Sequence, residues 1–152
     1  MAYVTSEARR ELLDEIATAI DRLGAALAAL GAAYEQLDER TADRLEDELF
    51  GPVQKAYGRA QRTSTSFAER YDLPARSFAA QAPRLPSTGV KPLIDSAADA
   101  VGAADDALAN LQDSMLPVEV GDPELRAGLV EVRELIGGFR AHARELVRGF
   151  GR

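Results

Sequence analysis

Apolar side chains recur at alternating steps of three and four residues along most of this 152-residue chain. The first series is Leu13, Ile16, Ile20, Leu23, Leu27, Leu30, Tyr34 and Leu37. This spacing places its members on one stripe of an α-helix, and it is typical of helices that pack lengthwise against other helices. A half-buried β-strand would need alternation at every second residue, so the pattern favours an all-α fold.

The same alternation recurs in two further series, and a weaker one lies between them. The second is Ile94, Ala97, Val101, Ala104, Leu108, Leu111 and Met115, and the third is Leu125, Leu129, Val132, Ile136, Phe139, Ala143, Leu146 and Phe150. The weaker series is Leu45, Leu49, Ala56, Ala60, Thr63, Phe67 and Tyr71. We therefore expect one domain, residues 1–152, folded as an antiparallel up-down four-helix bundle.

Helix-starting residues lie near the beginnings of these series. Thr5 or Ser6 is expected to cap the first helix and Thr41 the second, because their hydroxyl groups can accept a hydrogen bond from a free backbone N–H. Asp122 followed by Pro123 predicts the start of the fourth helix, which runs to about residue 149.

The chain direction between residues 38 and 52 has two interpretations. The chain can turn at 38–40 and keep Pro52 as a kink inside the second helix, or it can run as one helix to Phe50 and turn at Gly51 and Pro52. We prefer the first, because it gives four helices of roughly 27 to 32 residues whose stripes match in length.

The long connection spans residues 73–92 and holds four of the seven prolines. It also carries two large apolar residues, Phe78 and Leu85. We expect a short helix near 75–81 and an otherwise irregular path.

The composition excludes several kinds of chemistry. The chain has no Cys, which excludes disulfides and thiolate sites, and its one His cannot form a multi-histidine metal site. The formal net charge of -7 argues against a nucleic-acid binder. No run approaches the roughly 18 uncharged apolar residues that span a bilayer, and no signal-peptide core is visible, so we expect a cytoplasmic protein without membrane contact. The excess of 16 Arg over 2 Lys indicates the codon bias of a GC-rich, bacterial gene.

Charge alternates in sign along the chain, with an acidic segment at 93–125 between two more basic ones. Arg126, Arg133 and Arg140, spaced by seven, flank the fourth helix's stripe and are expected to pair with acids of the next helix. The alternative is an anionic ligand or an acidic partner along that groove.

The stretch 24–34 contains eleven residues without a charged side chain, most of them Ala or Gly. Such a surface is either an exposed run of good helix formers, or it is covered by the 73–92 connection or by a second protomer. The candidate interaction surface is Gly24, Ala25, Ala28, Ala29, Gly31, Ala32, Phe78 and Leu85.

These features favour a non-enzymatic interaction module that self-associates through the Ala/Gly face of its first helix. One alternative is a carrier of a small apolar ligand, with a core lined by Tyr34, Tyr57, Phe67, Tyr71, Phe139 and His142. A carboxylate-dependent enzyme is the third hypothesis. The sequence predicts no catalytic group, no cofactor and no metal site; the expected partners are another protein, self or heterologous, or a small apolar ligand.

Overall fold

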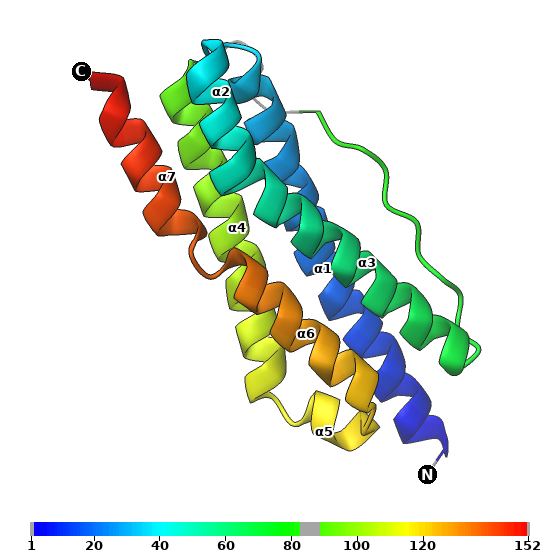
Figure 1. Ribbon diagram of the computed structural model, residues 1–152. Coiled ribbons are helices and arrows are strands. Elements are labelled where there is room, and N and C mark those ends of the chain that lie inside the picture. Colours follow the sequence, from blue (N-terminus) through cyan, green and yellow to red (C-terminus); the bar gives the residue numbers. More distant parts are fainter. Residues whose placement is uncertain (1, 83–88, 152) are drawn as a thin grey trace.

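The computed structural model describes residues 2–82 and 89–151, and every regular element within them is helical, which confirms the all-α prediction. α1 and α4 are each one long rod, α2, η1 and α3 form a continuous third, and α6 and α7 follow one another along a fourth, as can be followed in Figure 1. The elements are α1 (Ala2–Tyr34), α2 (Glu39–Leu45), the π-helical turn η1 (Glu46–Phe50), α3 (Gly51–Arg70), α4 (Val90–Asp113), α5 (Leu116–Val120), α6 (Pro123–Ile136), α7 (Phe139–Arg148) and the 3₁₀ turn η2 (Gly149–Gly151).

The four rods surround one core, and each runs antiparallel to its two main neighbours (Figure 1). α1 packs on α3 and α4, while the α6–α7 rod packs on the other sides of the same two helices. α3 and α4 therefore run in the same direction although they follow one another in the chain. The structure therefore does not have the predicted up-down order, in which α3 and α4 would run in opposite directions.

The reason lies in the connection between α3 and α4, residues 71–89, which we call the crossover. Its 19 residues can reach about 60 Å when extended, whereas the 24 residues of α4 span about 36 Å. The crossover is thus long enough to return the chain to the opposite end of the bundle. Residues 73–82 contain no helix, so the short helix expected at 75–81 does not form.

The predicted stripes form the core, with a systematic exception. Nearly all members are buried, but Tyr34, Met115 and Phe150 are 40%, 63% and 37% exposed. Met115 and Phe150 close their series, and Tyr34 is the last member of its series within α1. Each lies at or beyond a helix end, where no facing helix remains. The periodicity thus predicts which side chains are buried, except at the helix ends, where stripe members are exposed.

The chain turns at residues 35–38, next to the preferred position, and Pro52 lies inside the second rod. Asp38 rather than Thr41 caps α2, because its carboxylate accepts from the Thr41 N–H. Just before Pro52 the helix widens into η1, where Gly51 N–H donates to Glu46 O. Proline lacks an N–H and its ring clashes with the preceding turn, so a π-helical turn accommodates it without ending the rod.

Two other predicted helix boundaries change. α1 starts at Ala2, so Thr5 and Ser6 lie inside it and do not cap it. The fourth helix is not continuous to residue 149, because Gly137 and Gly138 break it into α6 and α7. The weak helix propensity of two consecutive glycines explains this break.

The prediction that Asp122 caps the fourth helix is confirmed, since its carboxylate accepts from Leu125 N–H at 2.9 Å. The same buried carboxylate binds Arg70 through both oxygens, at 2.6 and 3.0 Å, and accepts from Tyr71 Oη at 2.9 Å. Arg9 of α1 stacks on the Tyr71 ring at 3.9 Å. Asp122 therefore joins the end of α3 to the start of α6, and Tyr71 extends the contact to α1.

By length and composition alone, Ser6–Tyr34 could cross a membrane, which the sequence did not suggest. More than half of its most apolar window, 56%, is buried within the bundle. Contact with α3 and α4 accounts for the apolar composition, as expected of a core helix.

At Gly128, α6 lies close against the Thr63 side chain of α3. A Cβ there would overlap the side chain of Thr63, lying 2.8 Å from its Cγ2 and 3.1 Å from its Cβ. Thr63 is buried and hydrogen-bonded to Arg59 O, so it has little room to move.

We predict that Gly128→Ala destabilises the protein by about 1–3 kcal/mol, because overpacking outweighs the gain in helix propensity. Gly31→Ala is the matched control, since nothing lies within 4 Å of a Cβ at that position. It should stabilise by about 0.5–1 kcal/mol. Urea unfolding measures both, and equal effects of the two substitutions would contradict the assignment of Gly128 as a contact glycine.

We predict that Asp122→Asn lowers the free energy of unfolding by about 2 kcal/mol at neutral pH, because Arg70 loses its buried partner. Burial raises the pKa of Asp122, but hydrogen bonds from Arg70, Leu125 N–H and Tyr71 outweigh it and hold this pKa below the ordinary 3.8. The stabilisation is thus present above about pH 4 and is lost as the pH falls through the lowered pKa.

Urea unfolding from pH 7 to pH 2 should therefore show a gap between wild type and Asp122→Asn that closes below pH 4. Asp43→Asn, an exposed acid on α2, serves as the control and should change stability by no more than about 0.5 kcal/mol. A gap that persists unchanged at pH 2 would show that the charge of Asp122 is not what stabilises the fold.

Candidate functional site

The Ala/Gly face of α1 is divided between two neighbours inside the molecule. Ala29 is buried, with 4% exposure, on the helix that makes the most extensive contact with α4. Gly24 is buried too, because a Cβ there would lie 2.9 Å from Gln81 Nε2 of the crossover and 3.4 Å from Tyr57 Cε1 of α3. Ala25, Ala28, Gly31 and Ala32 are half-buried.

The crossover is held on α1 by polar contacts at two heights. Arg76 forms an ion pair with Asp14, and Gln81 Nε2 donates to Asp21 O at 2.9 Å. Between them, Phe78 is half-buried and packs against the hydrophobic core. The crossover thus covers the Gly24 end of the Ala/Gly face. Leu85 lies outside the described residues.

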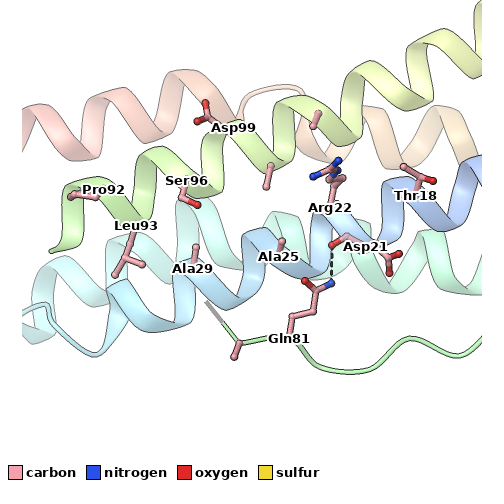
Figure 2. A pocket seen from close by; sticks show the side chains of 13 residues that line it. Thr18, Asp21, Arg22, Ala25, Ala29, Gln81, Pro92, Leu93, Ser96 and Asp99 are labelled. Carbon is pink, nitrogen blue, oxygen red and sulfur yellow. Dashed lines mark hydrogen bonds between the residues drawn. The ribbon is translucent and has the colours of Figure 1, made fainter. Parts of the chain in front are cut away.

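A groove remains between α1, α4 and the crossover, and we call it the α1–α4 groove. Figure 2 shows its side chains arriving from all three segments, with Gln81 reaching up from the crossover to α1. Its volume is about 490 Å³. The lining residues are Thr18, Asp21, Arg22, Ala25, Ala29, Gln81, Ala82, Pro92, Leu93, Ser96, Asp99, Ala100 and Ala103.

The groove is lined by small apolar side chains and polar ones in nearly equal number. Ala25 and Ala29 of α1 and Ala100 and Ala103 of α4 supply methyl groups to its walls. Arg22 extends from α1 toward α4, as Figure 2 shows. Ser96, Thr18 and the carboxylates of Asp21 and Asp99 supply the other polar groups. Such a lining suits a molecule with an apolar body and a polar group.

The aromatic residues expected to line a core cavity divide into two groups. Phe67 and Phe139 are buried, and Tyr57 and Tyr71 are half-buried; none of these four lines the α1–α4 groove. Phe67 packs against Tyr71 at a ring-centre distance of 4.8 Å. These side chains fill space between the helices.

Tyr34 and His142 are exposed, so their prediction as core-lining residues is wrong. Tyr34 is the last residue of α1, where the facing helices end. His142 follows the Gly137–Gly138 break, and its ring lies beside Gly138 on the surface of α7. The prediction for His142 assumed a continuous fourth helix, which the Gly137–Gly138 break interrupts.

The flanking arginines of the fourth rod behave differently from one another. Arg133 donates to Asp105 of α4 at 2.8 Å and to Gln112 at 2.8 Å, which is the pairing expected from the sequence. Arg126 is exposed, and Arg140 lies against Gly102 instead of an acid. Within residues 2–82 and 89–151, no group of three or more acidic or imidazole side chains is placed to hold a metal ion.

The sequence missed the groove itself, because it depends on the path of the crossover. The signal that could have found it is the Ala pairing between 24–34 and 97–104, which predicts close approach of the two helices but not what lies beside them. No protein-family model, curated protein or solved structure matches this chain.

Proposed function

We propose that this chain is a non-enzymatic binding module that holds a small amphiphilic molecule in the α1–α4 groove. The observation that carries the proposal is the groove's combination of alanine methyl groups with polar side chains, among which Arg22 is the cationic one. Its volume of about 490 Å³ falls within the range usual for small-molecule sites. This relocates the carrier hypothesis from the bundle core to the bundle surface.

The crossover forms a third wall of the groove, and unlike α1 and α4 its residues 73–82 are not helical. Gln81 is fixed by its bond to Asp21 O, so the crossover stands at a defined height above α1. A ligand between α4 and the crossover would therefore be enclosed on three sides. Enclosure matters because small ligands gain affinity mainly from the surface that they lose to solvent.

The neutral dye N-phenyl-1-naphthylamine tests the groove, because its fluorescence rises on transfer to an apolar site. We predict saturable binding to the wild type and about tenfold weaker binding to Ala100→Phe, whose ring would occupy the groove. Ala141→Phe adds the same ring at an exposed site on α7 and should bind as the wild type does.

Circular dichroism should show that both variants remain helical. A wild type that does not bind the dye saturably, or an Ala100→Phe variant that binds it equally well, would contradict the proposed site. Arg22→Gln refines the result, because it should weaken an anionic naphthalene sulfonate dye more than the neutral one.

Self-association through the part of the Ala/Gly face around Gly31 is the second candidate function. One observation favours it: beyond the crossover contact at Gly24, nothing lies within 4 Å of a Cβ on Gly31, and Tyr34 is 40% exposed. A second copy could approach the α1 backbone closely at this point, because glycine leaves it uncovered.

Sedimentation equilibrium tests this second candidate. We predict that Gly31→Glu converts a wild-type dimer into a monomer, because a charge would be buried without a partner. Glu35→Gln, one turn further along and exposed, is the control and should leave the dimer intact. A monomeric wild type at high concentration would exclude self-association by this face.

A further inference from the structure

A second groove lies between α4 and α7, on the other side of α4 from the crossover, and we call it the α4–α7 groove. Its volume is about 580 Å³. Asp99 lines both grooves and separates them. The lining residues are Lys91, Asp95, Ala98, Asp99, Arg140, Ala143, Arg144, Val147 and Arg148.

Positive charge dominates this groove although the whole chain is acidic. Four cationic and two anionic side chains line it, an excess of two positive charges in a protein of net charge -7. Lys91 Nζ and Asp95 Oδ2 are 2.8 Å apart, so those two charges largely compensate each other. The remaining charges are Arg140, Arg144 and Arg148 on α7 against Asp99 on α4.

The three α7 arginines lack the carboxylate partners that other arginines of the bundle have. Arg59, Arg70 and Arg133 each form an ion pair across a helix interface. Among the described residues, no carboxylate oxygen lies within 4 Å of the guanidinium groups of the α7 arginines. Their hydrogen-bond donors are therefore available to a ligand.

Helix geometry aligns these donors. Arg140, Arg144 and Arg148 are four residues apart, so they lie on one side of α7 at intervals of about 6 Å along its axis. Arg140 is seated against α4, because its Nη2 would lie only 2.6 Å from a Cβ on Gly102. The glycine leaves room for one guanidinium at the inner end of the row.

The groove between the charges is apolar. Ala98 of α4 and Ala143 and Val147 of α7 line it alongside the charged side chains. A less polar surrounding strengthens an ion pair relative to one in bulk water. Guanidinium groups also match the oxygen spacing of phosphate and carboxylate groups.

We propose that the α4–α7 groove is a binding site for a small oxyanion that carries two or more negative charges, a phosphate compound or a polycarboxylate. Arg140, Arg144 and Arg148 donate hydrogen bonds to its oxygens. The nearby carboxylate of Asp99 opposes a ligand of low charge, so the site favours multivalent anions. This site is separate from the α1–α4 groove and does not depend on the function proposed there.

Isothermal titration of the full chain with inorganic pyrophosphate and with citrate, at low and constant ionic strength, tests the proposal. We expect saturable 1:1 binding of at least one of them, and the two titrations distinguish a phosphate site from a polycarboxylate site. Arg144→Gln should weaken binding by about tenfold. Absence of binding by both anions would overturn the proposal.

Two further variants separate a site from general charge attraction. Arg126→Gln removes an exposed arginine on α6 outside the groove and should leave the affinity within about twofold. Asp99→Asn should tighten binding severalfold, because it removes the opposing carboxylate. Equal weakening by Arg126→Gln and Arg144→Gln, or weaker binding by Asp99→Asn, would overturn the site.

Discussion

The close packing of α1 on α4 is the interaction on which the rest of the structure depends. Both helices bury alanines in the core, including Ala26 and Ala29 on α1 and Ala97 and Ala104 on α4. Small side chains let two backbones approach closely, and they bury apolar area without large rings or branched chains. The same smallness leaves a groove where the interface meets the surface, so packing and candidate site have one origin.

The crossover follows from this pairing. Once α1 has α4 and α3 as neighbours, both antiparallel to it, the chain leaving α3 must return along the whole bundle before α4 begins. Residues 76–81 of the crossover lie along α1 between Asp14 and Gly24. Gln81 and Arg76 fix this segment by bonds to α1. At Gly24, the face that suggested a protein partner is covered by the protein's own chain.

The arginines of the bundle fall into two groups: those between α3 and α6 form ion pairs, and those on α7 form none with the residues that the structure describes. α3 and α6 share ion pairs along their length, from Arg59 with Glu131 to Arg70 with Asp122, and the last of these is buried on the acid side. Exposed ion pairs add little stability, so the ion pair and hydrogen bonds of Asp122 make the largest electrostatic contribution to the free energy of unfolding. Beyond the Gly137–Gly138 break, α7 is a separate helix, and its arginines have no such partners among the described residues. After the Gly137–Gly138 break, α7 therefore presents arginine N–H donors that no carboxylate of the described residues occupies.

The sequence by itself determined the helices and most of the core, since the three-and-four spacing specifies which side chains face inward in any helical packing. It also determined the Asp122 cap, because that cap depends on a hydrogen bond to a residue only three positions away. Tertiary structure alone decided the chain order and the exposure of Tyr34, Met115, Phe150 and His142. It also decided the two grooves. Periodicity describes one helix at a time, whereas chain order and grooves depend on which helices meet, and long-range contacts such as Gln81 with Asp21 leave no mark on local spacing.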